Sequence, residues 1–560
     1  MYAELAAVRA ELCEPGQLFE LEEVEVRGVR VKAWKNAAPS MREFWLQSAG
    51  HGDHDYLVYE DERWTYTEAH EEVARIARWL TDQGVGRHDR VAIAMRNYPE
   101  WMLSYWAVLS IGAVVVGVNA WWVPEELAYG LKDSAPKAMI CDRERLARFE
   151  EVRGELHDMV VAVVRHDDVP EYAVPWSDVL AAEADLPDVH IDPDDDACIF
   201  YTSGTTGHPK GAQLTHRGCA NNVLSSIYSN LTQIVAVSRS AGIDPPETKK
   251  STVLLTTPLF HVTANNVVAQ SNTLLGNTLV HMYKWDAGEA IRLIEREKIG
   301  SMSGVPTMSR EILSHPDFEK ADTSSLSALG GGGAPLQPDL VGKIAQRSSG
   351  MPVTGYGMTE VCGLASGIGG PYFQDKPESV GPALPVIEIR CVDPDGNDVP
   401  TGERGEVVMK GAQVIKGYLN REDATAETIV DGWLHTGDVG YLDEDGFLFI
   451  VDRIKDMVLR GGENIYCAEV EAVLYKYPGV QEAVVYGVPD EKMGEEVGAA
   501  IYVEGETPDA TELRAYCKDH MAAYKIPRYV WFVSEPLPRN ANGKFLKKAL
   551  RESLDLADAC

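Results

Sequence analysis

Short apolar runs alternate with helix-like segments along much of this chain, and this alternation limits the fold more than any other feature. RVAIAM (90–95), AVVVGVN (113–119) and KAMICD (137–142) each indicate a buried strand. Helical patterns at 100–112 and 124–134 separate these strands. Continuous apolar strands that alternate with helices are typical of parallel sheets covered by helices. Further strands of the series are predicted at 197–203, 252–258 and 277–282. The sequence therefore predicts an α/β fold.

The chain is too long for one hydrophobic core, and its character changes after the first two-thirds. With 560 residues, two or more domains are expected. Apolar runs joined by Asp-Gly turns at 386–400 and 440–453 indicate antiparallel hairpins. We predict a large N-terminal domain at 1–452, with parallel α/β layers and a β-rich subdomain. A short connection at 453–456 leads to a small α+β domain at 457–560.

Two finer expectations concern the C-terminal tail and one N-terminal segment. In the tail, helices are predicted at 468–477 and 509–520, and strands at 480–489, 497–505 and 529–534. A long surface excursion is predicted at about 230–250, because the apolar periodicity fades there and two prolines follow one another.

The net charge of the chain limits the classes of partner that it can bind. A net charge of −34 favours solubility and disfavours binding to nucleic acid or anionic lipid. An anionic ligand would need a local positive site against this background. The charge is uneven, since residues 453–560 carry only −4 of it. The segment Arg539–Arg551 within them has five cations and no acid.

Cysteine usage and hydropathy indicate the compartment. The nine cysteines include no C-x-x-C pair, which argues for reduced thiols in a cytoplasmic protein and against disulfides or a zinc site. The N-terminus lacks the cationic start and apolar run of a signal peptide. No uninterrupted apolar stretch reaches the roughly 18 residues of a membrane span, so no transmembrane segment is expected.

The stretch YTSGTTGHPKGAQLTH (201–216) is the strongest chemical signal. It follows a predicted strand, and Thr215 is placed to cap a helix that follows. A strand, glycine loop and helix suit phosphate, because glycines let backbone N–H groups approach an anion closely. Lys210 supplies a point charge, although the spacing is not that of a Walker loop. The predicted phosphate-binding residues are Thr202, Ser203, Gly204, Thr205, Thr206, Gly207 and Lys210.

YTSGTTGHPKG resembles the signature loop of the adenylate-forming superfamily, which includes acyl-CoA synthetases, peptide-synthetase adenylation domains and beetle luciferases. The resemblance covers nearly the whole chain, because further motifs recur in the family's order. They are PLFH (258–261), GGGGAPL (330–336), GYGMTE (355–360), HTGDVG (435–440), DRIKDMVLRGGENIYCAEVE (452–471) and NGK (542–544).

The resemblance implies a reaction of two steps. A carboxylate and MgATP give an acyl-adenylate and pyrophosphate, and a thiol then releases AMP. By resemblance, the loop holds the β- and γ-phosphates, Thr359 binds the α-phosphate and Glu360 holds Mg²⁺. Asp438 resembles the ribose ligand, and Arg453 is expected at the same sugar. The adenine walls by resemblance are Tyr356 and the glycines at 330–332, Gly331 and Gly332 among them.

The resemblance also assigns roles in a mobile C-terminal domain. Lys544 corresponds to the lysine that approaches the carboxylate and the α-phosphate, with Asn542 where the family usually has Thr. Lys455 corresponds to the hinge between the two half-reactions, so 453–456 is the expected hinge. Gly461 and Gly462 would let the pantetheine of CoA pass the backbone. Cys467 stands where relatives often have Pro or Ser.

The expected acyl site decides the substrate class. By resemblance it is lined by 261–266, 304–308, 330–335 and 357–366, which are mostly small or apolar and contain no Lys or Arg. His261 either gates this pocket, orients the carboxylate, or is a core histidine. A medium- or long-chain fatty acid is the first expectation; an aryl or cinnamate-type acid competes closely, and a sterol side-chain acid is a further option.

CoA is the expected acceptor, because the chain leaves no room for a carrier domain. We therefore predict an AMP-forming acid–CoA ligase that uses ATP, Mg²⁺ and CoA, as a monomer or homodimer. Three alternatives stay open: a fatty-acyl-AMP ligase, a luciferase-like oxygenase and a non-catalytic nucleotide-binding regulator.

Overall fold

The structure is a computed structural model that describes residues 1–202, 208–247, 249–461, 463–540 and 543–560. The chain divides into two compact units. Unit 1 consists of Met1–Glu388 and Met409–Leu434, and unit 2 of Ile389–Val408 and His435–Cys560. The boundary predicted after residue 452 falls within the sequence of unit 2, and it stays a prediction.

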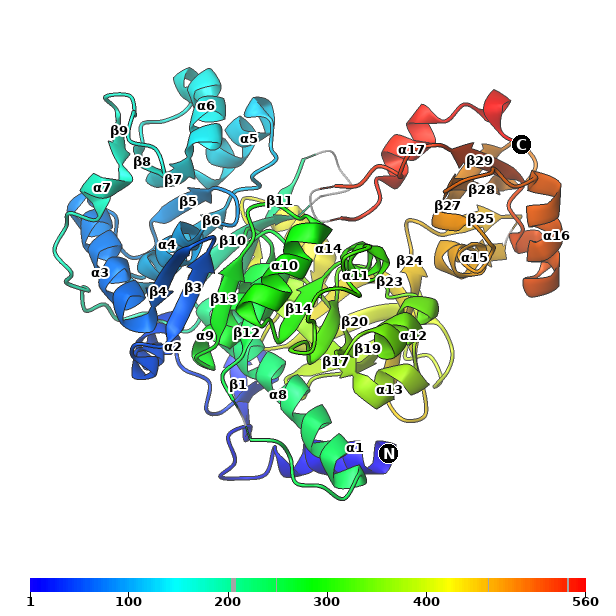
Figure 1. Ribbon diagram of the computed structural model, residues 1–560, viewed down its shortest axis with the longest axis horizontal. Helices are drawn as coiled ribbons and strands as arrows, with labels where there is room; N and C mark the ends of the chain where they lie inside the picture. The colour runs from blue at the N-terminus through cyan, green and yellow to red at the C-terminus, as the bar shows by residue number, and fades with distance from the viewer. Residues whose placement is uncertain (203–207, 248, 462, 541–542) are drawn as a thin grey trace. The chain divides into compact units, whose positions relative to one another are not determined.

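The first sheet of unit 1 is largely parallel (Figure 1). Its strands in spatial order are β21 (Gly417–Tyr418), β11 (Lys210–Thr215), β10 (Asp196–Thr202), β6 (Val114–Gly117), β5 (Arg90–Ala94), β7 (Ala138–Asp142), β8 (Val160–Val164) and β9 (Ala173–Pro175). The neighbours from β10 to β9 pair in parallel, and β11 runs antiparallel to β10. Helices α5 (Pro124–Ser134) and α6 (Arg143–Val152) contribute to its apolar core. The apolar strands predicted between residues 90 and 142 are confirmed.

A second sheet of unit 1 is also largely parallel. Its strands in spatial order are β17 (Gly363–Gly369), β16 (Met351–Met358), β15 (Ala328–Gly331), β14 (Ser301–Gly304), β12 (Thr252–Leu255), β13 (Thr278–His281), β3 (Asp55–Tyr59) and β4 (Glu62–Thr65). The interior pairs are parallel, and the edge strands β17 and β4 are antiparallel to their neighbours. Both sheets therefore have the parallel α/β character that the alternating runs predict.

Helix α4 (Pro99–Ser110) is largely apolar and has no exposed face. All of its residues are buried, and it contacts β5 and β6 of the first sheet and β3 of the second. A helix without a polar face has to be enclosed on all sides, so α4 forms part of the layer that the two sheets share. The other α-helices of unit 1 besides α8 are α1 (Tyr2–Glu11), α2 (Met41–Ser48), α3 (Tyr66–Asp82), α7 (Trp176–Val179), α9 (Ser271–Leu274), α10 (Ala287–Glu297), α11 (Pro306–Ser314), α12 (Pro338–Arg347), α13 (Gly370–Asp375) and α14 (Glu422–Thr428).

Helix α8 (His216–Ser240) begins where the sequence predicts and ends later. The Thr215 hydroxyl accepts a hydrogen bond from the Gly218 N–H at 3.1 Å, so the predicted N-cap is confirmed. The surface excursion predicted from residue 230 is wrong as far as Ser240, because the helix continues there. No helix in the described ranges combines the length and apolar character needed to cross a bilayer.

The extension of α8 has a physical cause that apolar periodicity does not register. Its buried residues there are Thr232, Ala236 and Ser238, which are small or carry a hydroxyl. The Thr232 hydroxyl donates to the Tyr228 carbonyl at 2.9 Å, so its polar atom is satisfied within the helix. Helix α1 packs along α8 and covers this face (Figure 1).

Unit 2 contains a hairpin and a small α+β sheet. The hairpin joins β23 (Trp433–Leu442) and β24 (Phe447–Arg453), as its Asp-Gly turn predicts. The hairpin predicted at 386–400 begins with β19 (Ile387–Val392), but its return is limited to the bridge between Val392 and Asp398. The remaining elements are β20 (Gly405–Gly411, in part), β25 (Val458–Arg460), β26 (Glu463–Ile465), β27 (Val480–Asp490), β28 (Gly494–Val503), β29 (Tyr529–Val533), α15 (Cys467–Leu474), α16 (Ala510–His520) and α17 (Lys547–Ser553). The predicted tail helices and strands are confirmed; α15 and α16 line one face of the sheet, and α17 packs on the other.

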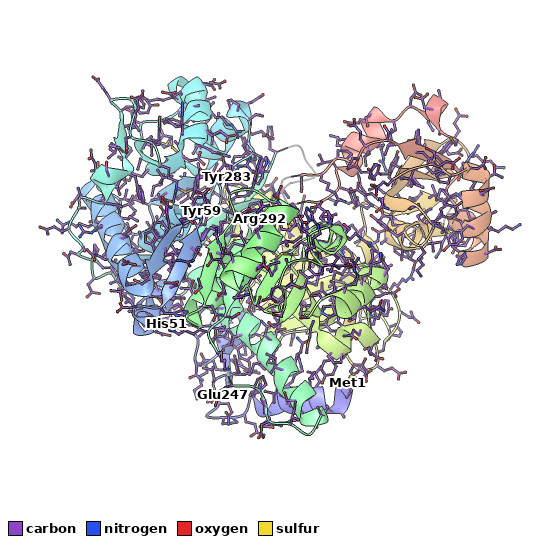
Figure 2. All side chains as sticks on the ribbon, viewed as in Figure 1. Met1, His51, Tyr59, Glu247, Tyr283 and Arg292 are labelled. Carbon is purple, nitrogen blue, oxygen red and sulfur yellow. The ribbon has the colours of Figure 1, made fainter. Side chains whose placement is uncertain are left out.

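A guanidinium between aromatic rings ties the two sheets of unit 1 together. Arg165, which follows β8 of the first sheet, forms ion pairs with Glu62 on β4 of the second sheet (2.6 Å) and with buried Glu100 (2.9 Å). Its guanidinium carbon lies 4.8 Å from the ring centres of both Tyr59 and Tyr98. Tyr59 can be located in Figure 2. Burial raises the pKa of Glu100, and the charge of Arg165 opposes that rise.

Replacing Arg165 with Met should destabilise unit 1 by about 3–5 kcal/mol, because Glu100 is left buried without its cation. A carboxyl group whose folded-state pKa is raised above its unfolded value loses stability as the pH rises. Arg165→Met should therefore lower the unfolding temperature more at about pH 8 than at about pH 5.

Thermal unfolding followed by tryptophan fluorescence measures this effect. Arg63→Met is the matched control. The Arg63 side chain is 45% exposed, and its partner Glu297 at 2.8 Å keeps a second cation, Arg296, also at 2.8 Å, so the loss should be about 0–1 kcal/mol. Equal losses for the two variants at both pH values would contradict the assignment.

Candidate functional site

The signature loop connects two strands rather than a strand and a helix. Ser203, Gly204, Thr205, Thr206 and Gly207 lie outside the described residues. At the flanks of the loop, Thr202 ends β10 and Lys210 begins β11, and the two residues pair across the strands. The predicted strand–loop–helix order is thus corrected, because β11 intervenes before α8. Helix α8 therefore does not begin directly after this loop.

Two glycines allow β14, β15 and β16 to approach closely. Gly331, with φ +144°, would place a Cβ atom 1.9 Å from the Gly304 carbonyl oxygen. At Gly330, with φ +157°, a Cβ atom would lie 2.0 Å from the Val353 oxygen. No other residue type fits at these contacts. Gly331 pairs with Thr354 of β16, two residues before Tyr356, so the predicted adenine residues lie on neighbouring strands.

Thr359 and Glu360 follow the carboxyl end of β16 in one turn of 3₁₀-helix, and both are 7% exposed. The Tyr418 hydroxyl donates to Glu360 Oε1 at 2.8 Å, and the Ile415 N–H donates to the Glu360 carbonyl at 3.0 Å. Burial, and after it the charge of Glu360, strongly raises the pKa of Tyr418. The phenol therefore stays a donor that orients the carboxylate.

Tyr418 also reaches the signature loop. The Lys210 ammonium lies 4.8 Å from the centre of the Tyr418 ring. One side chain thus contacts the predicted phosphate lysine through its ring and the predicted magnesium ligand through its hydroxyl. The sequence analysis missed Tyr418, and only the short run KGYLN (416–420) marks its place.

The donor set around Glu360 fits Mg²⁺. Magnesium is commonly held by one or two carboxylates together with substrate phosphates and water. Within the described ranges, no group of three or more His, Cys, Asp or Glu side chains is arranged to hold a metal. A single buried carboxylate agrees with an ion that arrives with a nucleotide.

His261 is half-buried at a turn that precedes an unusual helix. Its Nδ1 lies 3.2 Å from the Thr263 hydroxyl and accepts from the Thr263 N–H at 3.3 Å. A π-helix follows over Thr263–Gln270, and it buries Asn265 and Asn266. Such helices often occur at functional sites. His261 is therefore not fully enclosed.

In unit 2, the predicted ribose residues lie opposite each other. Asp438 of β23 and Arg453 of β24 are register partners, and Arg453 Nε donates to Asp438 Oδ1 at 3.1 Å. The Asp438 carboxylate is 5% exposed, while the Arg453 side chain is 55% exposed. The Thr436 hydroxyl accepts from the Asp438 N–H at 3.0 Å and fixes the turn. A buried carboxylate beside a guanidinium suits the recognition of a hydroxyl-bearing ligand.

The predicted C-terminal residues lie on turns of the same unit. Lys455 is exposed between β24 and β25. Gly461 has φ +60°, and its N–H donates to the Met493 carbonyl at 2.8 Å; Gly462 lies outside the described residues. Lys544 is exposed, and its N–H donates to Asn540 Oδ1 at 3.0 Å. Asn542 also lies outside the described residues.

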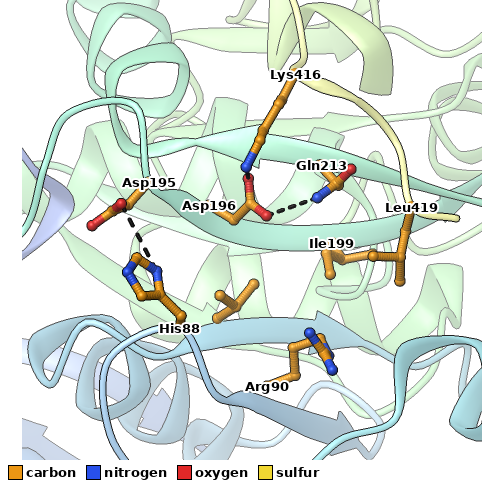
Figure 3. Close-up of a pocket in the computed structure, with 9 residues that line it drawn as sticks. His88, Arg90, Asp195, Asp196, Ile199, Gln213, Lys416 and Leu419 are labelled. Carbon is orange, nitrogen blue, oxygen red and sulfur yellow. Dashed lines mark hydrogen bonds and ion pairs between the residues drawn. The ribbon is translucent and has the colours of Figure 1, made fainter. Parts of the chain in front are cut away.

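A cavity of about 270 Å³ in unit 1 contains none of the predicted residues (Figure 3). Its lining consists of His88, Arg90, Val114, Asp195, Asp196, Ile199, Gln213, Lys416 and Leu419. Arg90, Val114 and Asp196 begin their strands, whereas the signature loop leaves the opposite end of β10. Asp196 pairs with Lys416 at 3.2 Å and accepts from Gln213 at 2.8 Å. Since these charges neutralise one another, the cavity is not suited to a polyphosphate.

Two family models match the chain. The model described as AMP-binding enzyme covers residues 44–419, and the AMP-binding enzyme C-terminal domain covers 469–544. The chain belongs to the AMP-binding enzyme family. The predicted resemblance to the adenylate-forming superfamily is confirmed.

Relatives of this AMP-binding enzyme activate different acids. This chain is 37% identical over 489 residues to a feruloyl-CoA synthase of Amycolatopsis sp, and the match covers 87% of this chain and 93% of that protein. It is 35% identical over 499 residues to a long-chain-fatty-acid–CoA ligase of Mycobacterium tuberculosis, covering 88% and 93%. The anthranilate CoA ligase AuaEII, solved with anthranoyl-AMP, superposes with a TM-score of 0.82 at 25% identity, covering 92% and 97%. The predictions of an AMP-forming acid–CoA ligase with ATP, Mg²⁺ and CoA are confirmed at the level of the family.

Replacing Tyr418 with Phe should weaken use of MgATP. A hydrogen bond to a charged group contributes about 1.5–3 kcal/mol, so kcat/KM for MgATP should fall about tenfold or more. The ring over Lys210 is kept in this variant, whereas Tyr418→Ala removes both contacts and should cost more. Pyrophosphate release at varied Mg²⁺ measures the effect.

Tyr172→Phe is the control for this prediction. Tyr172 donates to Glu150 at 3.2 Å on an exposed surface of the same unit. An unchanged Mg²⁺ dependence in Tyr418→Phe would remove Tyr418 from the site.

Proposed function

We propose that this chain activates an apolar monocarboxylic acid with MgATP and transfers the acyl group to CoA. The carboxylate oxygen attacks the α-phosphorus, pyrophosphate leaves, and an acyl-adenylate forms. The CoA thiolate then attacks the acyl carbon, and AMP leaves. The observation that carries the proposal is the side chain of Tyr418, which contacts both Lys210 and Glu360.

The roles of the residues follow from charge and position. Both steps place negative charge on oxygen, so electrostatic stabilisation and positioning supply most of the rate. The loop from Thr202 to Lys210 would hold the β- and γ-phosphates, and Thr359 the α-phosphate. Glu360 would hold Mg²⁺, which neutralises phosphate charge when bound. The adenine would lie against Tyr356, Gly331 at the end of β15 and Gly332, which follows it.

In the second unit, Asp438 would accept hydrogen bonds from the ribose hydroxyls, with Arg453 holding it in place. Lys544 would reduce the repulsion between the carboxylate and the α-phosphate. Lys455 would be the hinge between the two half-reactions. Gly461 and Gly462 would then face the pantetheine.

A medium- or long-chain fatty acid is the proposed substrate. The predicted acyl windows contain no Lys or Arg, and their half-buried side chains include Met308, Met358 and Leu364. Such a lining favours an acid whose remaining surface is apolar. His261 would gate the pocket or orient the carboxylate. A cinnamate-type acid is the second candidate, supported by the 37% identity to a feruloyl-CoA synthase.

A pyrophosphate-release screen tests the proposal. The acids are saturated fatty acids of graded length, ferulate, cinnamate and benzoate, each with and without CoA, and thioester is quantified separately. The highest kcat/KM for a fatty acid supports the first candidate, and the highest value for ferulate or cinnamate replaces it with the second. Adenylate without thioester indicates an acyl-AMP ligase, and light emission a luciferase-like enzyme. No release with any acid refutes the proposal.

Two further properties belong to this proposal. All nine cysteines are free thiols, which supports a reducing, cytoplasmic location. The partners are small molecules, and the enzyme is a monomer or homodimer, which sedimentation would distinguish.

Lys544→Ala should reduce adenylate formation by about 100-fold or more, because a cation at the developing charge is lost. Thioester formation from supplied acyl-AMP should remain. Rapid-quench assays of the two half-reactions measure this separation. Equal loss in both would refute the assignment.

Lys455→Pro should have the reverse effect. Proline restricts φ and removes the backbone donor, so rotation at this turn should be hindered after adenylation. Adenylate should accumulate while thioester formation slows. An unchanged thioester rate would exclude Lys455 as the hinge.

A further inference from the structure

A half-buried ionic cluster in unit 2 lies beside the proposed hinge. Lys547 Nζ lies 3.3 Å from Glu471 Oε1, and the two side chains are 25% and 17% exposed. Glu471 on α15 also accepts from the Val485 N–H at 2.8 Å. Asp452, the penultimate residue of β24, accepts from the backbone N–H groups of Arg453 and Cys467. The cluster therefore joins α15, α17 and the strand that leads into the hinge.

The nearby acids, and not the position of Lys547 on its helix, stabilise the positive charge of this residue. Lys547 is the first residue of α17, where a cation is disfavoured by the helix dipole. Burial lowers the pKa of Lys547, but Glu471 and then Cys467, Asp456 and Asp452 outweigh it, so the net shift is upward. The neighbouring Lys548 is 88% exposed and lies 3.9 Å from Glu552.

The pKa of Asp452 depends on the same neighbouring groups. Burial raises its pKa to about 6, while Lys547 and the N–H groups of Arg453 and Cys467 oppose that rise and Glu471 adds to it. The Cys467 thiol donates to the Asp456 carbonyl at 2.9 Å and holds the far side of the hinge turn. The turn that contains Lys455 is thus fastened at both ends to α15.

The described residues on both sides of the Lys544 turn are hydrogen-bonded to one another, and Lys547 follows closely in the sequence. The Asn540 N–H donates to the Lys544 carbonyl at 2.8 Å, and Asn540 Oδ1 accepts from the Lys544 N–H. Arg539 donates to the Gly543 carbonyl at 2.8 Å, and its guanidinium carbon lies 3.7 Å from the centre of the Phe545 ring. Only Phe545 and Leu546 separate Lys544 from Lys547. A tether at Lys547 therefore restrains the whole turn.

We propose that Lys547 is a positioning residue that anchors the Lys544 loop to the hinge segment through Glu471 and the carboxylates beside it. The Lys544 loop and α15 then move as one body, so that rotation at Lys455 carries Lys544 to a defined place. The inference rests on the proposed function, since it takes Lys544 as the adenylating lysine and Lys455 as the hinge.

Lys547→Met keeps the aliphatic stem and removes the charge, and Lys547→Arg restores it. Lys548→Met is the matched control on the same helix. Lys547→Met should lower kcat for adenylation about tenfold or more with KM for ATP changed less than about threefold, because the loop is misplaced while the phosphate residues are intact. Lys547→Arg should recover most of the rate, and Lys548→Met should stay within about twofold of wild type.

The pH profile separates positioning from a general loss of structure. Removing Lys547 takes away a cation that favours the ionised form of Asp452, so the folded-state pKa of Asp452, which burial already raises, should rise further. A group of this kind destabilises its surroundings as the pH rises above that pKa. The deficit of Lys547→Met should therefore shrink at about pH 6 and grow at about pH 8. A deficit independent of pH, or a rate equal to that of Lys548→Met, would overturn the proposal.

Hydrogen exchange gives a readout without turnover. Backbone amides of residues 539, 540 and 543–546 should exchange about tenfold faster in Lys547→Met than in wild type or Lys548→Met, whether or not the protein releases pyrophosphate. Glu471→Gln, which keeps the acceptor for Val485, serves as second variant if Lys547→Met does not fold, and should accelerate the same amides. Unchanged exchange overturns the anchor, whereas wild-type protein inactive with every acid overturns the proposed function.

Discussion

Negative charge is the constraint that the rest of this structure has to meet. The chain has a net charge of −34, and a carboxylate and ATP are themselves anions, so long-range electrostatics oppose their binding. Short contacts in partly buried places act against this background, because the effective dielectric there is lower than in water. Tyr418, joined to Lys210 and Glu360, is such a contact in unit 1. Asp438 with Arg453 is its counterpart in unit 2.

The two units meet this constraint with different kinds of structure. In unit 1, Gly331 and Tyr356 lie on strands of a parallel sheet, and Glu360 follows directly, so their places are set by a dense backbone ladder. In unit 2, Lys455 and Lys544 lie on exposed turns. Turns tolerate the φ/ψ changes that a hinge requires. Ionic and hydrogen-bonded ties, such as that of Lys547 to Glu471, can keep a turn ordered without building it into a sheet.

Elements with strong local signals were predicted well, and failures have physical causes. The apolar runs became β5, β6 and β7, and Thr215 caps α8 as its position before the helix predicts. The far half of α8 was not predicted because its buried residues are Thr232, Ala236 and Ser238, which are not strongly apolar. Hydropathy does not show that the Thr232 hydroxyl is hydrogen-bonded to a carbonyl of its own helix. Strand β11 was not predicted; it pairs with β10 directly across the signature loop, but its outer partner, β21, is distant in the sequence. The roles of the motif residues remain predictions.

By itself, the sequence determined the alternation of strands and helices and the motifs that place the chain in its family, since each is carried by neighbouring residues. Only the tertiary structure decided that Tyr418 meets Glu360, 58 positions away, and that Lys547 meets Glu471. The physical reason is that a local pattern sets which face of an element is buried, whereas the partner across the contact depends on sheet order and helix packing. Those arise from the whole chain at once.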